Sequence, residues 1–229
     1  MRTRSLLLAA AAFLGATGAS ANAPLNVVIV SQLKAAPEAL ASDAAMLAHL
    51  QSLGYAARIL EEAEPASAAA GADLIVISAT ASAHKLEDKY RTARVPVLVM
   101  ESYELRHMGM SGLRENVDFG TREKERYIQL VNAPHPLSAG LHAGLLNVYV
   151  KGASMNWGHP GPGASIISTF PGEPTMATEF AYEAGASMDG ENLAPARRVF
   201  LFIDNAAFPN LHDEGTRLFD AAVAWAAGK

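Results

Sequence analysis

Residues 95–101 read VPVLVME, an apolar run that ends directly in a carboxylate. Similar runs occur at Asn26–Val30, Asp73–Ile77 and Val199–Ile203. None of them alternates apolar with polar residues, and all are rich in valine, isoleucine or other apolar residues. This pattern is typical of strands that are buried on both faces of a parallel sheet. A weaker run, Tyr55–Leu60, predicts a strand at the edge of that sheet.

Helices are predicted between these strands. Ser42 and Asp43 are suited to the N-cap and first turn of one helix, which Gly54 is expected to end. Ser82 is suited to cap a second helix, extending to about residue 93. The last helix is predicted from about residue 213 to 227, with an apolar stripe on one face. The alternation of strand and helix predicts an α/β fold with a doubly wound, mostly parallel sheet of flavodoxin-like type.

The middle of the chain, Tyr103–Pro174, has a different composition. It is rich in glycine, proline, asparagine and histidine. Short strand-like segments occur within it at Tyr127–Val131, Asn147–Val150 and Ser165–Thr169. We therefore expect an inserted region of loops and antiparallel strands, after which Thr175–Tyr182 pairs with the strand at 199–203.

The N-terminus has the pattern of a signal peptide. Arg2 and Arg4 precede an uncharged apolar run, which ends in small residues that include Ala19-Ser20-Ala21. The run is shorter than the roughly 20 residues of a transmembrane helix. We expect residues 1–21 to be cleaved, leaving residues 22–229 as a single domain, secreted or periplasmic, with no stable membrane anchor.

Charge and cysteine content exclude several classes of function. Removing residues 1–21 takes away two arginines and no acid, so the net charge of −5 becomes −7. An acidic chain is not expected to bind nucleic acid. The sequence contains no cysteine, so a thiolate nucleophile and thiolate metal ligands are both excluded. The histidines lack metal-ligand spacing, and neither a metal nor a cofactor is expected.

The order of several short motifs resembles the ThuA-like (trehalose-utilisation) branch of the class I glutamine amidotransferase-like superfamily. The segments that carry the resemblance include DLIVISAT at 73–80, VPVLVME at 95–101, HPLSAGL at 135–141, NWGHP at 156–160 and ATEFAYEAGA at 177–186. They span nearly the whole chain in the family's order. The resemblance implies the fold and the position of a site, and the family name implies a carbohydrate ligand.

The chain departs from the glutamine amidotransferases at the nucleophile. Those enzymes carry a cysteine at a sharp turn after a central strand, and Glu101 stands at the corresponding position here. A carboxylate is a much weaker nucleophile than a thiolate. The resemblance therefore does not extend to amidotransfer.

Polar residues follow the predicted strands directly, where ligands of open α/β sheets bind. Glu101 is the strongest candidate for a general acid or base, because an apolar run precedes it; it is equally consistent with a structural carboxylate. Asp204 and His212 are candidate partners in catalysis. The candidate ligand-binding residues are Ser31, Thr80, Ser102, Tyr103, Asn205 and Trp157. The two aromatic residues could stack on a sugar or serve as local packing anchors.

Three functions follow from these candidates. The leading one is an exported ligand-binding domain with a small-molecule or sugar ligand. The second is a hydrolase or isomerase that uses Glu101 as general acid or base. The third is a structural or interaction module without a small-molecule site. A cleft in which Glu101, Asp204 and His212 converge would favour the enzyme, and an open aromatic shelf would favour binding.

Overall fold

The computed structural model describes residues 23–229, so the predicted signal peptide lies outside the described residues. The N-terminal half forms the parallel part of one sheet. Its strands are β1 (Asn26–Ser31), β2 (Ala56–Glu61), β3 (Leu74–Ile77), β4 (Val97–Val99) and, from the far end of the chain, β11 (Arg198–Leu201). They lie in the order β2-β1-β3-β4-β11, with parallel neighbours throughout. The predicted apolar runs are therefore confirmed as strands, and 55–60 as the edge strand.

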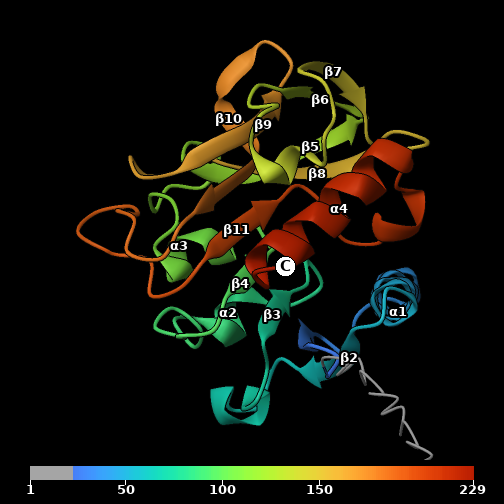
Figure 1. Cartoon of the computed structure of the whole chain (residues 1–229), viewed down its shortest axis with the longest axis vertical. Helices are drawn as coiled ribbons and strands as arrows, with labels where there is room; N and C mark the ends of the chain where they lie inside the picture. The colour runs from blue at the N-terminus through green and yellow to red at the C-terminus, as the bar shows by residue number, and fades with distance from the viewer. Residues whose placement is uncertain (1–22) are drawn as a thin grey trace, which may run out of the picture.

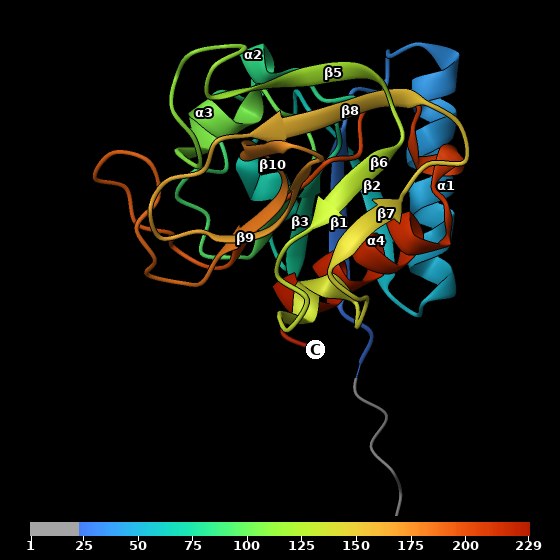
Figure 2. The same ribbon diagram turned by 90° about the horizontal axis from the view of Figure 1, so that it is seen from above.

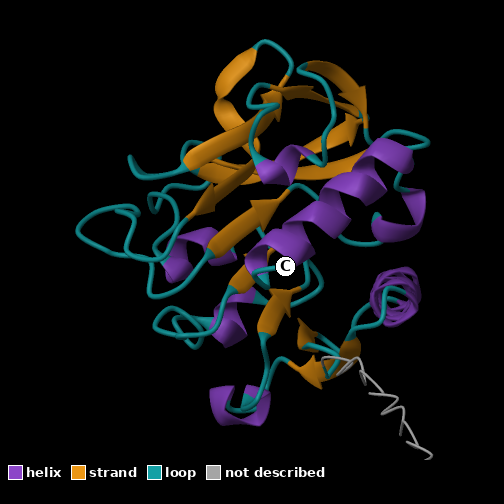
Figure 3. Ribbon diagram, viewed as in Figure 1, coloured by secondary structure: helices purple, strands orange, loops and turns teal. Residues whose placement is uncertain are grey.

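The inserted region extends the same sheet with antiparallel strands, as Figure 3 shows in orange at the top of the view. They are β5 (Phe119–Glu125), β6 (Tyr127–Leu130), β7 (Gly144–Asn147), β8 (Ala153–Gly158), β9 (Ser165–Phe170) and β10 (Glu173–Tyr182). Within residues 23–229 the sheet has 11 strands. Strand β10 pairs antiparallel with β11, as predicted, with Phe180 opposite Phe200.

Two details of this region differ from expectation. A strand is predicted at 147–150, but the observed strand β7 covers Gly144–Asn147, three residues closer to the N-terminus. In this position β7 pairs with β6. Strands β5 and β8 pair with each other, although the sequence pattern predicts neither of them. The charged residues of β5 interrupt the apolar pattern by which the other strands are predicted, because a strand with a solvent-exposed face does not form a continuous apolar run.

Helices cover both faces of the parallel strands. Figure 2 shows α1 (Pro37–Ser52) and α4 (Asp213–Ala226) on one side, and α2 (Ala83–Leu86) and α3 (Glu104–Met108) on the other. Short 3-10 turns add to these layers at η1 (Ala66–Ala69), η2 (Pro136–Ser138) and η3 (Phe208–Asn210). Each face has its own apolar cluster; Met46 and Phe219 belong to the first, Leu86 and Leu105 to the second. This three-layer arrangement is the doubly wound fold predicted from the sequence.

Two predicted helices have different bounds. Helix α1 begins at Pro37, five residues before the expected cap, because proline fits the first helical position. Ser42 and Asp43 consequently lie inside the helix and are buried. Helix α2 begins after Ser82 as expected but ends at Leu86, since Glu87 adopts a left-handed φ of 47°.

The last helix is confirmed close to its predicted bounds. Helix α4 packs along the sheet beside β11 (Figure 1), and Trp225 is only 8% exposed on its core side. The described helices include none that is both long and apolar enough to cross a membrane.

Candidate functional site

Polar side chains at the ends of β1 and β3 are held by one buried carboxylate. Asp43, on α1, accepts hydrogen bonds from the hydroxyls of Ser31, Ser78 (2.5 Å) and Thr80 (2.6 Å). All four residues are buried. A carboxylate with several hydroxyl donors can remain in the interior without an opposite charge. Sequence reasoning missed Asp43 as a site residue; its spacing of three residues from Met46 and seven from Leu50 shows that it shares their buried face.

Glu101 follows β4, which lies between β3 and β11 in the sheet. Its carboxylate accepts a hydrogen bond from the backbone N–H of Tyr103 at 2.9 Å. Burial, together with the nearby negative charge of Asp204, raises its pKa to about 8, against the lowering effect of that hydrogen bond. At neutral pH the group is therefore mainly protonated, which is the state of a general acid rather than of a base.

Asp204 follows β11 and forms the other half of this carboxyl pair. Burial raises its pKa, although hydrogen bonds from the backbone of Asn205 and from Asn156 oppose that rise. The side-chain amide of Asn156 donates to Asp204 at 3.1 Å and to the carbonyl of Met100 at 2.7 Å. Asn156 thus joins the ends of β4 and β11 from its position on β8. Sequence reasoning missed this role, because Asn156 lies in a strand that has no apolar run to reveal it.

Further polar groups are buried behind Glu101. Glu104 is fully buried, and within residues 23–229 neither of its carboxyl oxygens has a hydrogen-bond partner. Burial and the neighbouring Glu101 raise the pKa of Glu104 to about 9. The hydroxyl of Ser102 is likewise buried and unpaired in this part of the chain. Glu104 therefore adds a second protonated carboxyl to the interior next to Glu101, and Ser102 adds an unpaired hydroxyl within the described residues.

A hollow of about 330 Å³ opens at this edge of the sheet. It is lined by Gln32, Ala35, Ala36, Glu38, Ala39, Thr80, Asn205 and Ala206. The polar members include residues that follow β1, β3 and β11, and the sheet order places Glu101 between Thr80 and Asn205. Ala206 adopts a left-handed φ of 55°, a strained conformation for alanine that is often found at functional sites.

Other candidate residues lie outside this constellation or are covered. His212 precedes α4, where its ring contacts the carboxylate of Glu214 and not the carboxyl pair. Trp157 is 5% exposed and packs in the core beside Gly120, so its ring offers no open stacking face. The Tyr103 hydroxyl donates to Glu115 at 2.6 Å, and its ring packs edge-on against Phe119. Of the two roles left open for these aromatic residues, their contacts are those of local packing anchors, and they do not form an open shelf for a sugar.

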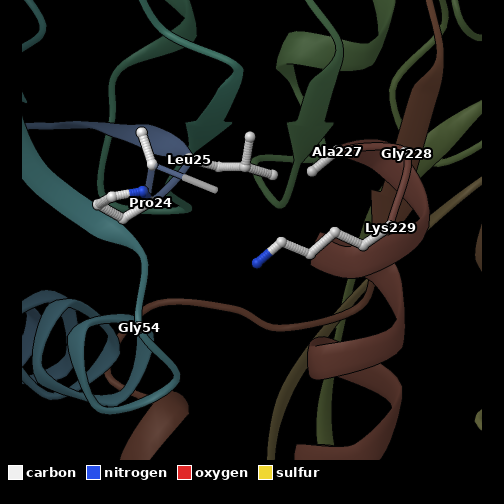
Figure 4. Close-up of a pocket in the computed structure, with 7 residues that line it drawn as sticks. Pro24, Leu25, Gly54, Ala227, Gly228 and Lys229 are labelled. Carbon is white, nitrogen blue, oxygen red and sulfur yellow. The ribbon is translucent and has the colours of Figure 1, made fainter. Parts of the chain in front are cut away.

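A second hollow, of about 370 Å³, lies between the two ends of the described chain (Figure 4). It is lined mainly by small apolar residues and backbone, together with Lys229, whose ammonium lies 4.0 Å from the centre of the Tyr55 ring. It contains no converging polar side chains from the described residues, in contrast to the hollow at the strand ends. Among residues 23–229, no group of three histidine or acidic side chains could hold a metal ion.

Comparison with protein-family models gives no match, and comparison with curated proteins gives none either. Comparison with solved structures gives several matches. A protein of Bacteroides uniformis described as ThuA-like superposes with a TM-score of 0.57 over 93% of this chain and 95% of its own, at 10% identity. The chain has the ThuA-like fold.

Two other structures support the same assignment of fold. A ThuA-like protein of Parabacteroides merdae covers 90% of this chain and 91% of its own, with a TM-score of 0.50 and 12% identity. A protein of Thermoplasma acidophilum described as part of a GMP synthase covers 90% and 95%, with a TM-score of 0.54 and 12% identity. The ThuA-like fold is therefore shared with amidotransferase-like domains, and at these identities the likeness concerns the fold alone.

Proposed function

We propose that this chain is an exported small-molecule-binding domain on the ThuA-like fold, with a carbohydrate ligand bound at the carboxyl ends of the parallel strands. The observation that carries the proposal is the hollow lined by Gln32, Thr80 and Asn205. These residues come from three different strand ends and converge on one space, where ligands of open α/β sheets bind. The volume lies near the lower limit of known ligand pockets, which suits a monosaccharide-sized molecule.

A thermal-shift screen against neutral sugars, amino sugars and sugar acids tests this proposal. A ligand that binds only the folded state raises the melting temperature. The shift should shrink in Asn205→Ala, which removes an exposed amide from the lining. The matched control is Asn132→Ala, which removes an amide elsewhere and should leave the shift unchanged. Equal shifts in both variants would place the ligand outside this hollow.

A hydrolase or isomerase is the second candidate, and the raised pKa of Glu101 beside Asp204 favours it. A protonated acid near neutrality can give a proton to a leaving group, while a nearby carboxylate accepts one. Chromogenic glycosides provide a direct assay. If the candidate is right, activity declines as the pH rises through about 8, and Glu101→Gln abolishes it while ligand binding persists. Retention of activity by Glu101→Gln would exclude this role.

Export rests on the N-terminal sequence, and we propose cleavage after Ala21. The charged start, the short apolar run and the small residues before Asn22 support it. N-terminal sequencing of the secreted protein should begin at or near Asn22. Recovery of the intact N-terminus in a membrane fraction would contradict the proposal.

A further inference from the structure

We propose that the ligand of the strand-end hollow carries a protonated amino group, so that an amino sugar or a related small amine binds better than a neutral or acidic sugar. This inference rests on the proposed ligand-binding function and specifies its chemical class. It follows from the acceptor that Thr80 offers and from the charge of the lining, where Glu38 is the charged side chain and lysine and arginine are absent among the described lining residues.

Thr80 presents only an acceptor to the hollow. Its single hydroxyl proton is directed to the carboxylate of Asp43, at 2.6 Å. Ser31 and Ser78, which lie 3.1 Å from the Thr80 oxygen, also donate to Asp43. A carboxylate is the strongest acceptor within reach, so it holds all three protons. The oxygen of Thr80 therefore offers lone pairs to a ligand, which must supply the hydrogen.

Gln32 is oriented in a similar way. Its amide nitrogen donates to the carboxylate of Glu62 at 3.1 Å. Burial alone would raise the pKa of Glu62, but hydrogen bonds from Lys85, the Ser82 backbone and Gln32 outweigh burial and lower it. Glu62 is thus an ionised acceptor that fixes the amide nitrogen of Gln32. The carbonyl oxygen of Gln32 remains for a ligand as an acceptor, beside the one N–H of the amide that Glu62 does not use.

The charged side chain among the residues that line the hollow is a carboxylate. Glu38 lines it from the first turn of α1, and no lysine or arginine occurs among the lining residues, all of which belong to the described part of the chain. Lys34 is on the same loop but is outside the lining. The N-terminus of α1 would by itself attract an anion, but Glu38 already occupies that position. An acidic ligand would therefore face a carboxylate without a compensating cation.

The carboxyl pair of Glu101 and Asp204 lies next to the lining residues, so a bound charge would influence its titration. Asp204 precedes the lining residue Asn205, and Glu101 lies between the strand ends that line the hollow. The titratable groups coupled to this pair are Tyr149 and Glu123 on the side of Asp204, and Glu104 and Tyr103 on the side of Glu101. A bound ammonium favours the ionised form of nearby carboxyls, whereas a bound anion opposes it.

A matched set of probes tests the inference by thermal shift and calorimetry at about pH 6, where an aliphatic amine is protonated. The probes are glucosamine, glucose, N-acetylglucosamine and glucuronate, together with putrescine as a cation without a sugar ring. We expect glucosamine to give the largest shift among the sugars. Acetylation removes its charge and should remove most of the gain.

Glu38→Gln tests the origin of the preference, and Glu173→Gln is the control, because Glu173 is exposed on β10, away from the hollow. Glu38→Gln should weaken glucosamine binding about threefold, the range for an exposed charge pair, and leave glucose unchanged. Glu173→Gln should change neither.

The outcomes separate this inference from the proposed function. If glucose or glucuronate binds as well as glucosamine, the preference for an amine is wrong while sugar binding stands. A Glu38-dependent shift with putrescine but with no neutral sugar supports the amine and contradicts the carbohydrate ligand. If no probe shifts the melting temperature, both proposals fail.

Discussion

The carboxyl of Glu101 links the folding of this protein to pH. Its pKa is about 8 in the folded chain and near its ordinary value of 4.5 when unfolded. The folded state therefore binds more protons between these two values. The stabilisation is complete below about pH 4.5 and is lost as the pH rises through about 8. Glu104, with a pKa of about 9, acts in the same direction.

We predict that Glu101→Gln makes unfolding less dependent on pH. The neutral amide keeps the shape of the protonated acid but cannot ionise, so the variant should be more stable than the native protein at pH 9, by about 1–3 kcal/mol. Urea denaturation at pH 5, 7 and 9 measures the difference. A loss of stability that is equal at every pH would show instead that Glu101 serves a structural partner as an ionised acceptor.

Asp43 is a structural residue whose side-chain oxygens serve as acceptors for three buried hydroxyls. It is the common acceptor for Ser31, Ser78 and Thr80, all in the interior. In Asp43→Asn an amide N–H₂ must face hydroxyls that were donors, and we predict a loss of about 2–4 kcal/mol. Denaturant melts should show it, with exposed Asp88→Asn as the control. A change below about 0.5 kcal/mol, typical of a surface position, would contradict the assignment.

At the scale of elements, Gly215 fixes how close α4 approaches the β7–β8 loop. A side chain at this position would collide with the backbone carbonyl of Val148 and with Leu211. Glycine in a helix normally costs about 1 kcal/mol relative to alanine. Here we predict that Gly215→Ala destabilises the protein, by about 1–2 kcal/mol, because overpacking exceeds that gain.

The control for this prediction is Thr216→Ala, one residue further along the same helix. It improves helix propensity and removes only the hydrogen bond that the Thr216 hydroxyl donates to the carbonyl of His212 at 3.2 Å, so its net effect should be close to neutral. Thermal melts of the two variants give the comparison. Stabilisation by both substitutions would mean that α4 can move away from Val148 at no cost.

Buried elements are the ones that can be predicted from sequence. Strands β1 and β3 have apolar residues on both faces, so a short continuous run identifies them without any other information. Strand β5 has an exposed face with alternating charges, and its pairing with β8 depends on contacts far along the chain. The start of α1 escapes prediction because Pro37 defines it, while Ser42 resembles a cap but lies inside.

At the scale of the whole molecule, the rule that ligands of open α/β sheets bind beyond the carboxyl ends of the strands points to a candidate site but does not give all of its residues. Thr80, Glu101, Asp204 and Asn205 do gather at one edge, because parallel strands end together there. His212 and Trp157 do not join them. Their positions depend on how α4 and β8 pack, and a lone histidine or tryptophan carries no sequence signal for that. Asp43 and Asn156 reach the site from a helix and an inserted strand, so adjacency along the chain could not identify them.

The last prediction concerns amidotransfer, the reaction of the superfamily that the sequence resembles. We expect no ammonia release from glutamine above that of Glu101→Ala, because three requirements of a nucleophile are missing. The sequence contains no cysteine. Glu101 is mainly protonated at neutral pH, since its pKa is about 8, and a neutral carboxyl is a poor nucleophile. Finally, the positive-φ residues of the described chain do not include Glu101, so the strained turn that exposes a nucleophile is not formed there. Release of ammonia by the native protein, lost in Glu101→Ala, would show that a carboxyl at this position can replace the thiolate.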